Sequence, residues 1–235
     1  MADFFRSIAD GFYENFIEAD RWKFLAEGLW VTVYVTVCAA LIGVIIGFLV
    51  GLVRANSVRS GKKNILTVIC DIYVTVIRGT PVMVQLLIIY YVVFASARNI
   101  PPAVSAIICF GINSGAYVSE IFRSGILSID IGQTEAGRSL GLSSSQTMSR
   151  IILPQAIKNA LPALGNEMIT LLKETSVVGY IGLVDLTKSH AIIKSRTFSA
   201  FWPLLAIAAI YLVIVVGLTK LLGILERRLR QSDKR

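Results

Sequence analysis

The sequence predicts an all-α polytopic membrane protein with about five transmembrane helices. Hydrophobic residues make up 55% of the 235 residues, and the mean hydropathy of +0.70 is too apolar for an ordinary soluble domain. Several apolar runs reach the roughly 20 residues that a helix needs to cross a bilayer. Basic residues gather at the ends of these runs, as orientation signals do. The formal charge of +8 therefore indicates a membrane and not a nucleic acid.

Residues 1–24 are expected to form an extracytoplasmic segment lying on the membrane surface. Apolar side chains recur there at helical spacing, opposite several acidic residues, at Phe5, Ile8, Phe12 and Phe16. Such an amphipathic helix lies in the interface between lipid and water. The stretch has acidic residues and no basic n-region, which argues against a signal peptide.

The transmembrane domain is expected over residues 25–225, followed by a cytoplasmic basic tail at 226–235. The five predicted spans cover about Leu29–Val53, Ile65–Ala95, Ala103–Phe122, Leu164–Val184 and Phe201–Leu225. The second is too long for a straight crossing, because roughly 31 residues extend about 46 Å as a helix, against a hydrocarbon core of about 30 Å. The motif Arg78-Gly79-Thr80-Pro81 predicts a break, since Pro81 removes a backbone hydrogen bond and disfavours helical geometry at Thr80.

Lys and Arg predict the orientation of these spans. With the N-terminus outside and the C-terminus in the cytoplasm, fourteen basic residues lie on the inner side and seven on the outer side. The stretch KSHAIIKSR, Lys188–Arg196, is locally more basic than an outer loop should be. This topology places residues 132–160 in the cytoplasm. We expect the protein to lie in the inner or plasma membrane of the cell.

A polar, serine-rich stretch, EAGRSLGLSSSQTMSRIILP, interrupts the apolar runs from Glu135 to Pro154. Its pattern predicts a first short helix that ends at Gly141, a residue suited to left-handed geometry. Ser143 then caps a second helix, and Gln146 completes a capping box. Met148, Ile151 and Ile152 would share one face of that helix, and Pro154 would help to end it. An amphipathic loop resting on lipid is the alternative.

The spacing of this stretch resembles the EAA signature of ABC-importer permeases, EAA-x3-G-x9-I-x-LP, with Gly137 in place of the second alanine. In that family the segment forms coupling helices that sit in a groove of a cytosolic ATPase and pass its motion to the membrane spans. The resemblance assigns this coupling role to Glu135, Ala136, Gly137, Gly141, Leu142, Ser143, Ile151, Leu153 and Pro154.

The resemblance extends to permeases for polar amino acids through VIRGTPVMVQLL, NSGAYVSEIFRSGI, PQAIKNALPALGNEMITLLKETS and LERRLR. It implies three partners: a cytosolic ABC ATPase, a second permease copy in a homodimer or related heterodimer, and an extracytoplasmic amino-acid-binding protein. The chain itself lacks the phosphate-binding motif G-x4-G-K-[ST]. We therefore expect no enzyme activity and no cofactor bound directly, with ATP and Mg held by the partner ATPase.

Polar side chains within the third span are candidates for contact with the cargo. Asn113, Tyr117 and Glu120 lie at i, i+4 and i+7, on one helical face. The amide could meet the carboxylate of an amino acid, and Glu120 could meet an ammonium or guanidinium group. Buried charge is costly and often marks a transport path, although a polar seam that only joins helices is the alternative.

Two further spans carry weaker candidates for the cargo site. Glu167 lies in the fourth span with Glu174 two turns further on, although an internal ion pair with Lys173 is the alternative. Asp71 shares a face of the second span with Arg78, and the resemblance places the break at Arg78–Pro81 near the translocation path. Gln85 lies on the half-helix after the break.

Other functional classes find less support in the sequence. A secondary transporter or channel would be expected to show inverted repeats, and no convincing self-similarity is present. A membrane sensor would use Ser143–Ser145 for phosphorylation, but helix capping explains these serines more simply. The three cysteines, Cys38, Cys70 and Cys109, lie in apolar segments without metal-ligand spacing, which is typical of small buried side chains.

Overall fold

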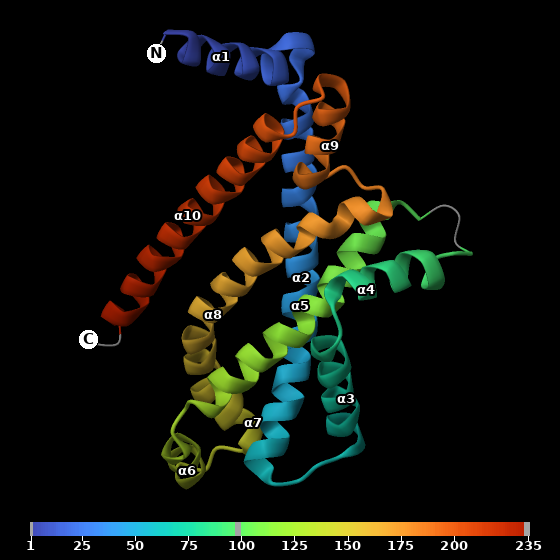
Figure 1. Ribbon diagram of the computed structural model, residues 1–235. Coiled ribbons are helices and arrows are strands. Elements are labelled where there is room, and N and C mark those ends of the chain that lie inside the picture. Colours follow the sequence, from blue (N-terminus) through green and yellow to red (C-terminus); the bar gives the residue numbers. More distant parts are fainter. Residues whose placement is uncertain (1, 97–99, 233–235) are drawn as a thin grey trace.

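The computed structural model describes residues 2–96 and 100–232, and every regular element within these ranges is helical (Figure 1). The α-helices are α1 (Ala2–Phe12), α2 (Trp22–Ser60), α3 (Ile65–Gly79), α4 (Val82–Ile88), α5 (Pro102–Leu127), α6 (Ile131–Ser139), α7 (Ser144–Thr147), α8 (Leu153–Glu174), α9 (Leu186–Thr197) and α10 (Phe201–Ser232). Arg98, Lys234 and Arg235, which contribute to the expected charge bias, lie outside the described residues, as do the side chains of Phe5 and Arg230.

Within the described ranges, three helices are long and apolar enough to cross a membrane: α2, α5 and the stretch Phe201–Arg228 of α10. A fourth candidate is the pair formed by α3 and α4, where α4 continues into a π-helical turn over Ile89–Val93. The two halves of this pair are bent by 105°. The chain is extended at Thr80, and α4 begins after Pro81, so the predicted break in the second span is confirmed.

The bounds predicted for the fourth span are wrong. The helix there, α8, begins at Leu153 and ends at Glu174, and a 3-10 segment over Thr175–Ile181 follows it. The chain then turns at Gly182, whose φ is +81°, so no single helix covers Leu164–Val184. Charged residues within α8 interrupt its apolar run, and hydropathy alone therefore shifted the prediction toward the C-terminus.

Pro154 starts α8 and does not end the preceding helix. It lies in the first turn of α8, where proline lacks only an N–H that would have no partner in the helix. Before it, the chain makes a π-helical turn over Met148–Ile152, in which the amide of Leu153 bonds the carbonyl of Met148. The wider turn lets the helix pass the proline.

The helix that forms the first predicted span is longer than predicted at both ends. Helix α2 runs from Trp22 to Ser60, beyond the apolar run Leu29–Val53, and ends at Gly61 with φ +66°. The basic residues that mark the end of the apolar run, Arg54 and Arg59, continue the helix, because arginine is a good helix former. The two guanidinium groups consequently project from fixed positions on α2.

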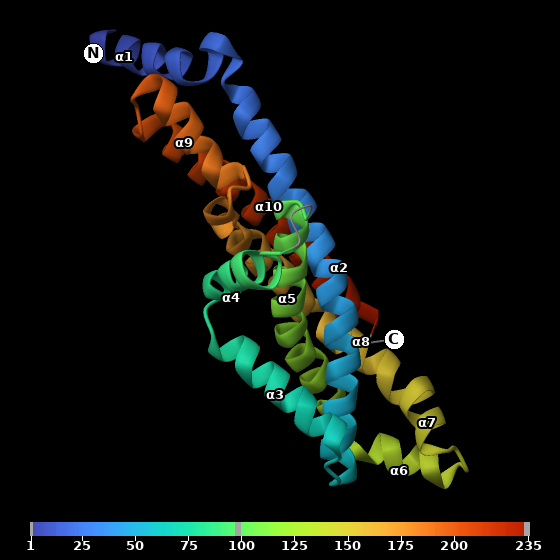
Figure 2. The same ribbon diagram turned by 90° about the vertical axis from the view of Figure 1, so that its right-hand side faces the viewer.

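Helices α2 and α5 cross in close contact at the centre of the molecule (Figure 2). Three glycines spaced by four residues, Gly43, Gly47 and Gly51, lie on the contact face of α2. A Cβ atom would lie 2.9 Å from the Ser114 Cβ at Gly43, 2.5 Å from the Val118 Cβ at Gly47, and 2.7 Å from the Ser119 carbonyl oxygen at Gly51. Small residues at this spacing let two helix backbones approach closely. The three glycines and their α5 contacts are called the α2–α5 seam below.

Helix α10 lies at the periphery. In the most apolar stretch of 18 residues in α10, only 11% is buried within the chain. Leu212 and Val213 are 63% and 71% exposed. In contrast, Val35, Leu86 and Phe110 of the main apolar core are fully buried. The free apolar surface of α10 is available to lipid or to a second subunit.

We expect Gly47→Ala to lower the thermal stability of the purified protein in detergent. The added methyl group would press on Val118, and overpacking of this kind costs about 1–3 kcal/mol. Gly217→Ala on α10 is the matched control, because a Cβ atom added there would meet no heavy atom within 4 Å. The control should be neutral or stabilising, since alanine is the better helix former. Equal unfolding temperatures for the two variants would contradict a tight seam.

Candidate functional site

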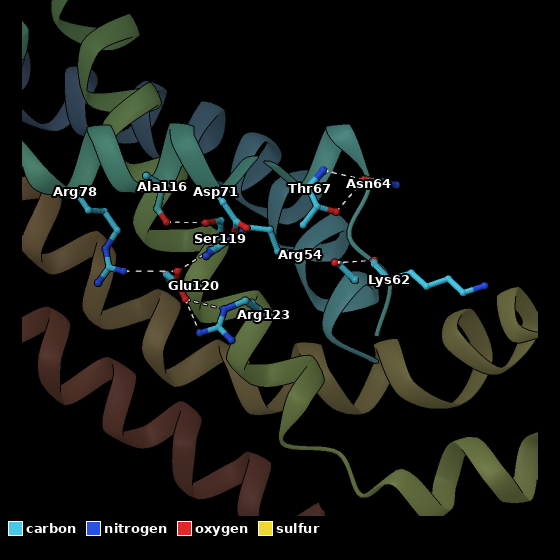
Figure 3. A network of polar contacts seen from close by, with 11 residues as sticks. Arg54, Lys62, Asn64, Thr67, Asp71, Arg78, Ala116, Ser119, Glu120 and Arg123 are labelled. Atoms are coloured by element: carbon cyan, nitrogen blue, oxygen red, sulfur yellow. Dashed lines mark hydrogen bonds and ion pairs between the residues drawn. The ribbon is translucent and has the colours of Figure 1, made fainter. Parts of the chain in front are cut away.

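Four charged side chains from α2, α3 and α5 surround Glu120 (Figure 3). Glu120 Oε1 lies 2.6 Å from Arg54 Nη1 and 3.6 Å from Arg78 Nη1. Its other oxygen, Oε2, lies 2.7 Å from Arg123 Nη2. Arg54 also donates from Nε to Asp71 Oδ1 at 2.7 Å. We call these residues the Glu120 cluster.

The Glu120 cluster is partly withdrawn from solvent. The side chains of Arg54 and Glu120 are 15% and 19% exposed. Charges in such surroundings are stable only when they are paired and hydrogen-bonded. The carboxylate of Glu120 is therefore committed to arginines of its own chain. The cluster also includes Asp71 and Arg78, which confirms that they share one face of α3.

Two amides placed by sequence at the cargo site bond each other. Asn113 Nδ2 donates to Gln85 Oε1 at 3.0 Å. Gln85 Nε2 donates to the carbonyl of Ile77 at 2.7 Å and to Thr80 Oγ1 at 2.7 Å. The last carbonyls of a helix have no partners within the helix. Gln85, on the other side of the break, therefore donates a hydrogen bond to the Ile77 carbonyl at the end of α3. Asn113 then ties the broken helix to α5.

The remaining candidates have fewer partners. The guanidinium carbon of Arg78 lies 5.1 Å from the ring centroid of Tyr117, in the range of a cation–π contact. Glu167 Oε1 accepts a hydrogen bond of 3.2 Å from Ser114 Oγ. None of the ion pairs in residues 2–96 and 100–232 involves Lys173, so the internal pair weighed for this lysine is not formed.

The turn at Gly141 and the helix cap at Ser143 form as the pattern of the polar stretch predicts. Helix α6 is followed by Gly141, whose φ is +81°, and the capping box of α7 is formed in both directions. Ser143 Oγ accepts from the Gln146 amide at 3.2 Å, and Gln146 Oε1 accepts from the Ser143 amide at 2.9 Å. Glu135 and Ala136 are exposed, and Leu140 is 81% exposed. This surface is open to a partner.

Gly137, the departure from the EAA signature, lies against the second half of the stretch. A Cβ atom there would lie 2.8 Å from Thr147 Cγ2 and 3.2 Å from Ile151 Cδ1. Thr147 is fully buried. The glycine therefore makes room for a β-branched neighbour, which the sequence pattern alone did not indicate.

The polar stretch is joined to the spans by an apolar cluster. Ile152 of the π-helical turn packs with Ala55 of α2, Ile126 of α5 and Ala156 of α8, and Met148 packs against the same cluster. Ile152 is 1% exposed. The predicted apolar face is thus confirmed for Met148 and Ile152, while Ile151 points toward Gly137.

Residues 43–231 match the family described as the inner membrane component of binding-protein-dependent transport systems. The chain belongs to this family. It is 36% identical to the L-cystine transport system permease protein TcyB of Bacillus subtilis, over 92% of this chain and 90% of that protein. It is 40% identical to the glutamine transport system permease protein GlnP of Escherichia coli, over 68% of this chain and 74% of that protein.

Solved structures share the fold of this permease-family chain. A chain from the crystal structure of an amino acid ABC transporter with histidines superposes with a TM-score of 0.81 at 43% identity, covering 90% of this chain and 96% of that one. A chain of the MetNI methionine ABC transporter in inward-facing conformations gives 0.76 at 19% identity, covering 88% and 97%. The predicted all-α architecture of an ABC-importer transmembrane subunit is confirmed.

We expect Glu120→Gln to destabilise the permease more than Asp71→Asn. The first change leaves Arg123 and Arg78 without their carboxylate. Removing one partner of a fully buried ion pair costs roughly 3–5 kcal/mol, and the cost here should be smaller because these two arginines are 30% and 43% exposed. Asp71 is 38% exposed and forms its ion pair with Arg54, so its loss should cost less still. Thermal unfolding in detergent measures both variants, and a larger loss for Asp71→Asn would contradict the central place of Glu120.

Proposed function

We propose that the chain is the transmembrane permease subunit of an ATP-driven importer for polar amino acids. The observation that carries the proposal is the exposed surface of α6 and its turn, held in shape by the α7 capping box at the spacing of the EAA signature. The names of the relatives, which refer to cystine and glutamine, support an amino acid as cargo. A separate cytosolic ATPase would bind ATP and Mg and dock on this surface.

We further propose that the N-terminus lies outside the cell and that the coupling segment, α6 to α7, lies in the cytoplasm. Figure 2 shows the coupling segment and the loop between α2 and α3 at one end of the molecule, and α1 at the other. Four of the basic residues counted as inner, Arg59, Lys62, Lys63 and Arg138, line the cavity between that loop and the coupling segment, as orientation by positive charge requires. An extracytoplasmic binding protein would deliver the cargo at the end with α1.

One copy of the chain encloses little space, so a transport path needs a second copy or a related subunit. Two-fold pairing is the commonest arrangement for a single species. The exposed apolar faces of α3 and α10 offer surface for such a contact or for lipid. ATP-driven approach of two ATPases would bring two coupling segments together and rock the spans between inward-open and outward-open states.

The cargo site is proposed at the helix break and the polar face of α5. Asn113, Tyr117, Glu120, Gln85 and Glu167 remain its candidates. Among these, Tyr117 and Glu167 have the fewest competing contacts, whereas Gln85, Asn113 and Glu120 would shape the wall through their mutual and ionic bonds. Arg78, whose side chain is 43% exposed, lies beside Tyr117. A guanidinium and a carboxylate together suit the two charges of an amino acid.

We expect a C-terminally tagged chain, purified in mild detergent from its native host, to retain a stoichiometric ATPase. Glu135→Arg should abolish retention, because it reverses a charge on the exposed docking surface. Glu14→Arg makes the same change on the exposed outer segment and should retain the ATPase. The measurement is mass spectrometry and ATP hydrolysis of the eluate. Absence of any ATPase with the unmodified chain, even after crosslinking, would refute the importer.

We expect Glu167→Gln to reduce uptake of labelled glutamine, arginine or cystine by proteoliposomes containing the complete transporter. Loss of one charged hydrogen bond to the cargo would lower affinity by roughly 10- to 100-fold. Retention of the ATPase should be unchanged, since Glu167 lies far along α8 from the coupling segment. Unchanged affinity for every cargo tested would remove Glu167 from the site.

A further inference from the structure

Arg59 of α2 binds three separate points on another part of the chain. Its Nη2 donates to the carbonyls of Ile126 at 2.6 Å and Ile129 at 3.0 Å. Its Nη1 donates to Thr134 Oγ1 at 2.8 Å. These acceptors lie at the end of α5, in the turn after it, and in the first turns of α6. One guanidinium thus joins α2 to the place where the membrane span meets the coupling segment.

The chemistry of these acceptors suits an arginine. Helix α5 ends at Leu127, and the carbonyls at a helix C-terminus have no partners within the helix. A cation is also favoured there by the helix dipole. The planar fork of arginine can serve several acceptors at once, whereas the ammonium of lysine acts as a point charge. Arg59 therefore holds the α5–α6 junction in one geometry relative to α2.

Along the chain, helix α2 is connected to the coupling segment only by way of α3, α4 and α5. The segment continues directly from α5 and into α8, while α2 connects to α3 through residues 61–64. A cavity of about 1060 Å³ lies between that loop and the coupling segment, lined by Lys62, Thr134, Ser144 and others. Movement of the segment therefore reaches α2 through non-covalent contacts. At the α5–α6 junction these are the apolar cluster around Ala55 and the Arg59 hydrogen bonds, and further along α5 they are those of the α2–α5 seam.

We propose that Arg59 is a positioning residue that makes α2 move together with the coupling segment. The proposal rests on the proposed function, in which an ATPase displaces that segment. When α6 is displaced, the bonds to Ile126, Ile129 and Thr134 carry α2 with it. Helix α2 carries Arg54 of the Glu120 cluster, so the displacement reaches the charged centre of the spans. Without Arg59, the ATPase still docks and hydrolyses ATP, but less of that hydrolysis is converted to transport.

The test compares Arg59→Met with Lys62→Met in the complete transporter from the native host, reconstituted in proteoliposomes with its binding protein. Lys62 is exposed and its ammonium makes no ion pair in residues 2–96 and 100–232. The readout is ATP hydrolysed per molecule of labelled glutamine, arginine or cystine taken up. Arg59→Met should raise this ratio about threefold or more, a coupling loss within the range that single contacts produce. Lys62→Met should leave it unchanged.

A second variant guards against a folding defect. Thr134→Val removes one acceptor with little change of shape, and we expect a smaller rise in the same ratio. The double variant should then exceed Arg59→Met by little, because both changes break the same contact. Parallel loss of uptake and hydrolysis at a constant ratio, or an equal rise with Lys62→Met, would overturn the proposal. Failure of the unmodified chain to retain an ATPase would instead refute the proposed function.

Discussion

The close contact of α2 with α5 is the constraint on which the rest of the structure depends. Within a bilayer, helices gain little from burying apolar surface against each other, so their association relies on close packing and polar contacts. Gly43, Gly47 and Gly51 provide that packing on the α2 side. Arg54 lies about one turn beyond the last glycine and meets Glu120, and Arg59, five residues further along α2, reaches the end of α5. A wider seam would separate both arginines from their acceptors.

The seam also explains why Glu120 is not a free carboxylate. Once α2 and α5 are in contact, Arg54 is held within 2.6 Å of Glu120, and Arg123 on the same helix completes the ion pairing. The break after Gly79 then brings Arg78 to the edge of the cluster at a longer distance of 3.6 Å. Three guanidinium groups against two carboxylates leave an excess positive charge beside the break. Arg78, with the longest contact and the greatest exposure, is the member best able to exchange partners.

The sequence predicted the features that depend on neighbouring residues. Pro81 breaks a helix by its own geometry, and Gly141 and the Ser143–Gln146 capping box act within a few residues. It could not predict contacts such as Arg54–Glu120 or Arg59–Ile126, which join residues 66 and 67 positions apart. The place of Pro154 at the start of α8 could not be predicted, because the π-helical turn before it has no local sequence signal and contains Ile152, which packs against α2 and α5. The glycines of the seam did carry a readable signal, a spacing of four within an apolar helix.

The coupling segment combines internal rigidity with limited attachment. Its capping box and the fit of Gly137 against Thr147 hold α6 and α7 as one unit, so a force on its exposed face displaces the whole unit. Ile152 packs against α5 and α8 in an apolar cluster, and packing of this kind has little directionality. The bonds of Arg59 are directional and resist separation as well as approach. In the proposed transport cycle the segment is both pushed and pulled, and Arg59 adds a hydrogen-bonded link between α2 and the α5–α6 junction to the apolar packing there.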